Sequence, residues 1–243
     1  MTIENHHRRS FVHPLLEQAG AEFAEIAGGN VALNVGNDES AAADIIRRMG
    51  LVDLSPLPRI GYKGVGAPQW LRQQSLQLPL QANSAVTQTD GTLVAALSAQ
   101  EHLLLSPYTA AAINATSAAG ASGICQQVEN AWSLDSAAQC YQLPRADSHC
   151  WFAVCGSSVG EMLPKLCGVD LRPHVFADNA VAQTSLARVN AIIIRQTIAN
   201  TAVFHLLTDS ASAEYLWRCL LDAMAEFDGA VVGLNALQSL HND

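Results

Sequence analysis

Positive charge and long apolar runs are both scarce in this sequence of 243 residues. Only 13 Lys and Arg stand against 22 Asp and Glu, so the formal net charge is −9. Because contacts with phosphates and anionic lipids depend on basic side chains, this balance argues against nucleic acid and membrane surfaces as partners. No stretch approaches the roughly 18 apolar residues of a membrane-spanning helix, and the first residues lead into no apolar segment typical of a signal peptide. We therefore expect a cytoplasmic protein.

The cysteines also lack the spacing that metal or redox sites need. There is no C-x-x-C pair and no histidine at zinc spacing, and most of the cysteines lie in apolar runs such as residues 150–155. Reduced core thiols are the expected state. His6 and His7 are interpreted as part of a polar terminus. We therefore expect no metal site. The six cysteines are Cys125, Cys140, Cys150, Cys155, Cys167 and Cys219.

What the chain does contain is an internal repeat. Residues 61–108 resemble residues 156–215: each begins with a Gly-rich turn and a short amphipathic stretch, and the segments 83–89 and 179–184 are close copies. In this alignment His102 and His205 share one position, which favours packing roles for both. A repeat of this length is typical of two related domains.

Local signals predict the elements of each copy. Asp90-Gly91 between two extended segments predicts a hairpin, and residues 93–97 are apolar on both faces, which indicates a buried strand. Ser106-Pro107 predicts a helix start. In the second copy we expect one long strand over residues 186–195 and a helix over about residues 211–227, ending at Gly229. Each copy thus has the order β-α-β-β-α with a further strand, which is the ferredoxin-like arrangement. The two copies together predict an α+β fold of two ferredoxin-like domains.

Several segments carry a family resemblance. Gly50-Leu-Val-Asp-Leu-Ser55 and Gly64-Val-Gly-Ala-Pro-Gln-Trp-Leu71 resemble the opening of the glycine-cleavage T-protein, a folate-binding aminomethyltransferase. Residues 182–190 and 213–220 are similar to sarcosine oxidase γ subunits. The resemblance implies a discontinuous first domain of residues 1–50 plus 151–243 and an inserted second domain of residues 51–150. It also implies that the T-protein's C-terminal barrel is lacking.

Two departures from the T-protein pattern concern chemistry. The family's catalytic aspartate follows the Gly-rich hairpin turn, where this chain has Gly91-Thr-Leu-Val-Ala-Ala-Leu97, with alanines in that place. The family's pterin-binding glutamate near the end has, at best, Asp243 as its counterpart. The cysteine motif of the folate-dependent iron–sulfur maturation proteins is absent as well. We therefore expect no catalytic residue in this chain, and the sequence identifies no cofactor-binding residue.

The resemblance then implies a function in a complex. We expect a γ-type accessory subunit of a sarcosine-oxidase-like flavoenzyme that demethylates sarcosine or a related N-methyl amine, structural rather than catalytic. Flavoprotein partner subunits would hold the flavin and the dinucleotide. The alternative is a free-standing, folate-binding aminomethyltransferase-like protein, for which tetrahydrofolate is a possible cofactor.

One rival comes from a different class of protein. Residues 156–160 match the G-x-S-x-G pattern of a hydrolase, with Ser158 as nucleophile, Asp170 or Asp178 and then His205 in Ser–Asp–His order. Against it, no oxyanion segment precedes the motif and the parallel βα alternation is missing. A structural turn is the preferred interpretation, and a serine hydrolase stays a remote alternative.

Overall fold

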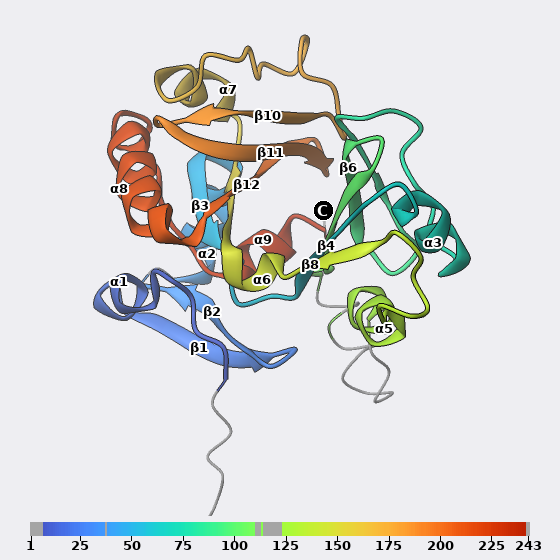
Figure 1. The fold of residues 1–243 in the computed structure, drawn as a ribbon. Helices are drawn as coiled ribbons and strands as arrows, with labels where there is room; N and C mark the ends of the chain where they lie inside the picture. Colours follow the sequence, from blue (N-terminus) through green and yellow to red (C-terminus); the bar gives the residue numbers. More distant parts are fainter. Residues whose placement is uncertain (1–6, 37, 110–112, 114–122, 242–243) are drawn as a thin grey trace, which may run out of the picture.

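The computed structural model describes residues 7–36, 38–109, 113 and 123–241. Its strands form sheets of two, six and five strands. Figure 1 shows the two larger sheets facing each other, with α8 and α3 on their far sides. Within the described ranges, every helix is too short or too polar to cross a bilayer.

The six-stranded sheet is antiparallel except at one edge, where β13 pairs in parallel with β3. Two tight turns connect its first three strands, and their residues Ala187, Arg188, Ala199 and Asn200 all have positive φ. The predicted long strand over 186–195 is present, but it spans Val189–Ile198. It begins three residues later than predicted because Ala187-Arg188 turns, without the Asn or Gly that usually marks such a turn. In spatial order the strands are β10 (Val181–Leu186), β11 (Val189–Ile198), β12 (Thr201–Asp209), β9 (His149–Cys155), β3 (Gly50–Asp53) and β13 (Ala230–Val231).

The five-stranded sheet is antiparallel throughout. The predicted hairpin at Asp90-Gly91 is confirmed, with Gly91 at a φ of 91°. Residues 93–97 are all buried, as their apolar character on both faces predicted. In spatial order the strands are β5 (Ser84–Thr87), β6 (Leu93–Ser98), β7 (Glu101–Leu105), β4 (Arg59–Lys63) and β8 (Tyr141–Leu143).

The two sheets repeat one strand order, which confirms the internal repeat. The order β5-β6-β7-β4-β8 corresponds to β10-β11-β12-β9-β3. In both copies the strand that leads into a helix ends at a glycine with positive φ. Gly64 follows β4 with a φ of 132°, and Gly156 follows β9 with a φ of 123°. A Cβ at Gly156 would lie 2.3 Å from the Arg48 carbonyl oxygen, so only glycine fits this turn.

Strand pairing corrects the sequence alignment of the two histidines. With the turn glycines superposed, the cross-strand partners make His102 equivalent to Phe204 and His205 equivalent to Leu103. His102 therefore lies on the outer face of its sheet, and His205 lies on the inner face. Aligning His102 with His205 was wrong by one residue, and a shift of one residue moves a strand side chain to the opposite face.

The two sheets join through the segments that the sequence showed to be close copies. Asn83 and Asn179 both have a φ of 60°, a conformation that asparagine tolerates well. The Ala85 amide donates to the Asn179 carbonyl at 2.8 Å, and the Val181 amide donates to the Asn83 carbonyl at 3.0 Å. These reciprocal bonds relate the two copies by an approximate two-fold axis.

Helices cover the outer faces of the sheets. The predicted helix over about 211–227 appears as α8 with a short 3-10 turn after it, and it ends at Asp228, whose φ is 49°, rather than at Gly229. Residues 106–108 are not helical, so the predicted helix start at Ser106-Pro107 is wrong. The helices are α1 (His13–Gln18), α2 (Glu39–Met49), α3 (Ala67–Gln73), α5 (Ile124–Ala131), α6 (Arg145–Ser148), α7 (Val159–Met162), α8 (Ala213–Met224) and α9 (Leu234–Ser239), with 3-10 helices η1 (Leu163–Lys165), η2 (Ser210–Ser212) and η3 (Ala225–Phe227).

A separate hairpin, β1 (Ala21–Ile26) and β2 (Gly29–Val35), precedes the larger sheets. β2 packs against α9, and the approach is close enough that a Cβ on Gly233 would lie 1.9 Å from the Leu33 carbonyl oxygen. The described part of the N-terminal segment thus lies on the body of the protein.

The apolar core has three layers: one outside the six-stranded sheet, one between the sheets, and one outside the five-stranded sheet. The fold is mixed α and β, as predicted, although each copy has five strands where a ferredoxin-like unit has four. The division into residues 1–50 plus 151–243 and 51–150, and the missing barrel, stay predictions.

Candidate functional site between the two sheets

A chain of hydrogen bonds crosses the apolar layer between the sheets. The Trp151 indole Nε1 donates to Nδ1 of His205 at 3.1 Å, so His205 carries its proton on Nε2 and donates it to Oε1 of Gln196 at 2.8 Å. Gln196 in turn contacts the Thr87 hydroxyl at 3.3 Å. The chain therefore runs from the core of the second copy to an exposed residue of the first.

His205 is neutral in this setting. It is fully buried, and burial lowers the pKa of its imidazole to about 3. The ring of Tyr108 lies 5.7 Å from that of His205 and 6.5 Å from that of Trp151. Burial also raises the pKa of the Tyr108 phenol, so the whole cluster is uncharged at neutral pH.

A cavity of about 320 Å³ opens at the margin of the inter-sheet layer. Gln183 stands at the junction of the two copies, where its Nε2 donates to Oδ1 of Asn83 at 2.9 Å and to the Leu97 carbonyl at 2.6 Å. The size is at the lower end for small-ligand sites. The lining residues are His149, Gln183, Thr184, Asn190, Ala191, Ile192 and Leu207.

A charged network lies beside this cavity. Glu101 accepts from Arg145 at 2.6 Å and from Lys63 at 2.8 Å. Arg145 also contacts Nε2 of His149 at 3.1 Å, which leaves Nδ1 of His149 to donate to the Ser148 hydroxyl at 2.9 Å. Burial first, and then the nearby guanidinium groups, lower the pKa of His149 to about 4. The imidazole facing the cavity is thus neutral as well.

Only one acid, Asp53, is buried among the described residues. Burial raises the pKa of its carboxyl group, while hydrogen bonds from Ser10 and Ser55 oppose the rise. Its neighbour Arg59 donates to the carbonyls of Ser55 and Leu57, and also to those of Ala146 and His149. Asp53 and Arg59 therefore hold loops together, and neither lines the cavity.

The residues of the hydrolase pattern do not come together. Both ring nitrogens of His205 are engaged, by Trp151 and Gln196, and neither meets a serine or a carboxylate. Asp170 instead pairs with Arg172 at 2.6 Å. The turn that carries Ser158 exists equally in the first copy, at Gly64. The structure thus contradicts a catalytic triad of Ser158, His205 and an aspartate.

Alanines occupy the strand positions where the T-protein resemblance would place an acid. Ala95 is fully buried in the apolar layer between the sheets, and its neighbour Ala96 is buried too. Asp243 lies outside the described residues. Sequence reasoning missed the contact of Trp151, His205 and Gln196. Because side chains alternate between the two faces of a strand, placing Val203 and Leu207 on the inner face would have placed His205 there as well.

Neither metal nor disulfide chemistry is visible in the described residues. No three His, Cys, Asp or Glu side chains there gather at metal-binding distance. The six cysteines are free; five are buried, and Cys219 is half-buried. Burial raises the pKa values of the Cys125, Cys150 and Cys155 thiols, which keeps them protonated and unreactive.

Comparisons with known proteins identify the fold. Two solved structures are similar: a heterotetrameric sarcosine oxidase from Corynebacterium sp. U-96 and the glycine cleavage system aminomethyltransferase T from Bartonella henselae. The match to a chain of the first has a TM-score of 0.60 at 21% identity, and it covers 92% of this chain and 97% of that one. The second has a TM-score of 0.66 at 18% identity and covers 97% of this chain and 62% of its own.

The sequence comparisons agree. An aminomethyltransferase from Saccharopolyspora erythraea is 25% identical in an alignment 249 residues long, which covers 96% of this chain and 62% of that protein. The chain thus spans less than two thirds of this curated relative. The family model described as the GCVT N-terminal domain matches residues 12–243. The chain therefore belongs to the GCVT N-terminal domain family.

Proposed function

We propose that this chain is a γ-type accessory subunit of a sarcosine-oxidase-like, multi-subunit flavoenzyme that demethylates sarcosine or a related N-methyl amine. The observation that carries this proposal is the alanine at position 95, fully buried between the sheets of a fold that matches a chain of a heterotetrameric sarcosine oxidase over 92% of this chain. The flavin and the dinucleotide would belong to partner subunits, and the setting would be the cytoplasm.

The chemistry between the sheets supports a structural role. A folate-dependent transfer needs a group that holds the amine nitrogen and balances developing positive charge. Ala95 occupies the place that the T-protein resemblance assigns to that acid, and an alanine can do neither. The cluster around His205 is neutral, and its hydrogen bonds are made within the chain.

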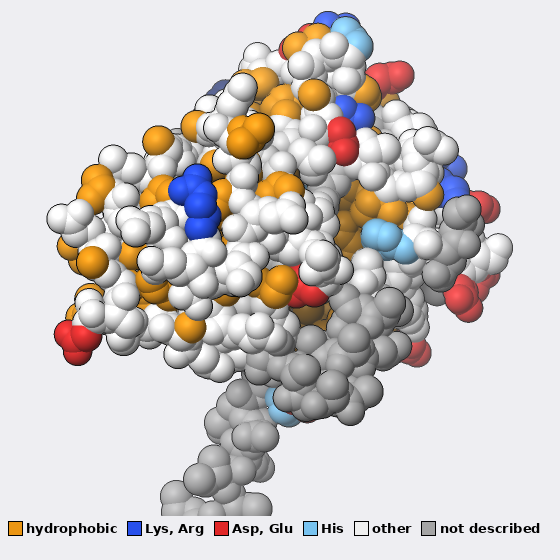
Figure 2. All heavy atoms as spheres, turned by 90° about the vertical axis from the view of Figure 1, so that its right-hand side faces the viewer, with side chains coloured by type: hydrophobic (Ala, Val, Ile, Leu, Met, Phe, Trp, Pro, Cys, Tyr) orange, Lys and Arg blue, Asp and Glu red, His pale blue; other side chains and the backbone are white. Residues whose placement is uncertain are grey.

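The surface also favours a subunit. Four of the seven large hydrophobic residues that are exposed in the described ranges come from residues 65–141: Val65, Leu80, Leu134 and Tyr141. Figure 2 shows hydrophobic side chains spread over the side that carries the five-stranded sheet, with few charges between them. This side is our candidate contact surface, because charged side chains are depleted in the centre of protein interfaces.

The test is purification of the tagged chain from the organism that encodes it. We expect a flavoprotein to co-purify, with a flavin absorption spectrum and sarcosine-dependent oxygen consumption. Val65→Glu should reduce its recovery, whereas Val175→Glu, at an equally exposed valine (59% and 58%), should not. A chain that purifies alone as a soluble monomer would contradict the proposal.

The second candidate is a free-standing, folate-binding aminomethyltransferase-like protein. The cavity of about 320 Å³, lined by neutral hydrogen-bonding groups of His149, Gln183 and Asn190, favours it. Thermal melts with and without excess tetrahydrofolate test this candidate. Ligand at a hundred times its dissociation constant stabilises by about 2.7 kcal/mol, so a clear upward shift would favour the folate protein over the accessory subunit.

A further inference from the structure

The outer edge of β1 has no partner strand in the described part of the chain. β2 is flanked on both sides, by β1 and by Arg8, whose amide donates to the Gly28 carbonyl while its carbonyl accepts from Asn30. β1 is flanked by β2 alone, and it lies at the margin of the molecule (Figure 1). Because an unpaired strand edge is a template for another strand, this edge is a candidate interface.

The hairpin register shows which backbone groups point outward. The two-residue turn at Ala27-Gly28 makes Ile26 and Gly29 a hydrogen-bonded pair, so Ala24 bonds inward to Val31 in the same way. The N–H and C=O groups of Phe23 and Glu25 therefore face away from β2. No other described segment bonds to them.

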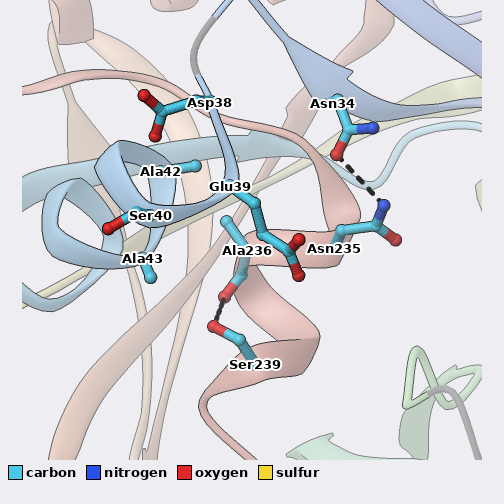
Figure 3. A pocket seen from close by; sticks show the side chains of 9 residues that line it. All are labelled: Asn34, Asp38, Glu39, Ser40, Ala42, Ala43, Asn235, Ala236 and Ser239. Atoms are coloured by element: carbon cyan, nitrogen blue, oxygen red, sulfur yellow. Dashed lines mark hydrogen bonds between the residues drawn. The ribbon is translucent and has the colours of Figure 1, made fainter.

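The surroundings of this edge are acidic. Glu22, on β1, lines a cleft of about 450 Å³ together with Asp38 and Glu39, and no Lys or Arg lines it. Figure 3 shows the adjoining hollow, where the side chain of Glu39, at the start of α2, points toward Asn235 while that of Asp38 points away. Glu25 is 58% exposed and contacts only His7, at 3.3 Å, among the described residues. Glu25 and the cleft lie on opposite faces of β1, because side chains alternate along a strand, so both faces of this edge carry acids.

We propose that the β1 edge binds an extended, Lys- or Arg-bearing segment of a partner subunit as an added third strand. Backbone bonds to Phe23 and Glu25 would hold the segment, and its basic side chains would lie opposite Glu25 and in the cleft beside Glu22 and Glu39. Main-chain bonds with alternating side-chain contacts are how added strands are recognised. A second copy of this chain fits poorly, because self-pairing would bring the acids of both edges together. The identity of the partner as a subunit rests on the proposed function.

The probe is a fluorescent extended peptide with lysines on both faces and valines between them, titrated against the intact chain. Glu25→Pro removes the outward N–H without breaking a bond to β2, because edge strands tolerate proline where the N–H faces solvent. Glu25→Gln is the matched control, since it removes the same charge and keeps the N–H. We expect binding to Glu25→Pro to be about tenfold weaker than binding to Glu25→Gln. Glu22→Gln should weaken the salt dependence of binding.

A second measurement covers the case in which Glu25→Pro does not fold. Amide hydrogen exchange of the unchanged chain should slow at Phe23 and Glu25 when the peptide binds, while the amide of Ala24 is already protected by Val31. Three outcomes would each overturn the inference. The lysine peptide does not bind, a peptide with glutamates in place of the lysines binds equally well, or the chain self-associates in a way that Glu25→Pro abolishes. If a flavoprotein co-purifies equally well with Glu25→Pro, the subunit proposal stands and this surface is wrong.

Discussion

Replacing His205 with leucine measures what the buried hydrogen-bond chain contributes, because pH changes the contribution in a known direction. The folded pKa of His205 is about 3, since burial disfavours the charged ring, whereas a histidine in an unfolded chain has a pKa of about 6.5. Below about pH 6.5 the unfolded chain therefore binds a proton that the folded chain does not. The free energy of unfolding falls as the pH falls from about 6.5 toward about 3, and at pH 5 His205 costs about 2 kcal/mol.

The His205→Leu variant has two separable effects. At pH 8 it leaves the Trp151 indole N–H without its acceptor, which costs about 1–3 kcal/mol; leucine itself suits the site, because Leu103 holds the equivalent position in the first copy. At pH 5 protonation of His205 in the unfolded chain lowers the free energy of unfolding of the wild type by about 2 kcal/mol, and the variant has no such loss. The difference in free energy of unfolding between the two proteins therefore shrinks by about that amount. The low pKa of His149 lowers stability in both proteins and cancels in the comparison.

Urea unfolding at pH 8 and pH 5 tests this expectation. The double variant Trp151→Phe with His205→Leu is the control, since it removes the donor with the acceptor and should recover part of the loss at pH 8. A stability difference between wild type and His205→Leu that stays constant between the two pH values would refute the reasoning, because it would mean that His205 titrates alike in the folded and unfolded chains.

Three further substitutions test the fold and the site. Gly156→Ala should destabilise by about 3 kcal/mol in a thermal melt, because its Cβ would meet the Arg48 carbonyl, while Gly160→Ala should stay within about 1 kcal/mol of wild type; equal melts would contradict the requirement for glycine at position 156. Arg59→Met should cost about 3–5 kcal/mol in urea unfolding, because it strands four carbonyls and leaves Asp53 without its cation, and near-wild-type unfolding would contradict that role. Ala95→Asp should cost more than about 3 kcal/mol by burying an unpaired carboxyl group; an unchanged melt would show that the inter-sheet layer admits an acid.

Sequence alone located the elements whose signals are local. Asp90-Gly91 predicted its hairpin because only residues that tolerate positive φ fit such a turn. Residues 93–97 predicted a strand buried on both faces because they are apolar without alternation. The helix at Ala213–Met224 was predictable because its apolar residues recur at helical spacing.

Features without a local signal were missed. Ala187-Arg188 turns although neither residue favours positive φ, so tertiary packing rather than local preference sets that turn. The contact between Trp151 and His205 joins residues 54 positions apart, and it depends on a strand register that a one-residue error reverses. This single register error hid the polar chain between the sheets, since it assigned His205 to the position of outward-facing His102.

The equivalent positions of the two copies differ in a way that bears on function. Counting back from the turn glycines, Trp151 corresponds to Arg59, just as His205 corresponds to Leu103. In the second copy the indole is tied to a neutral imidazole; in the first, the guanidinium is tied to four backbone carbonyls. Both copies thus place a large polar side chain at the same point. The indole N–H and both terminal guanidinium nitrogens are bonded within the chain, whereas the buried Nε of Arg59 has no hydrogen-bond partner among the described residues. A group whose bonds are already made has none to offer a substrate without breaking one, and breaking a buried bond costs about 1–3 kcal/mol. Such an interior favours a scaffold over a site of group transfer.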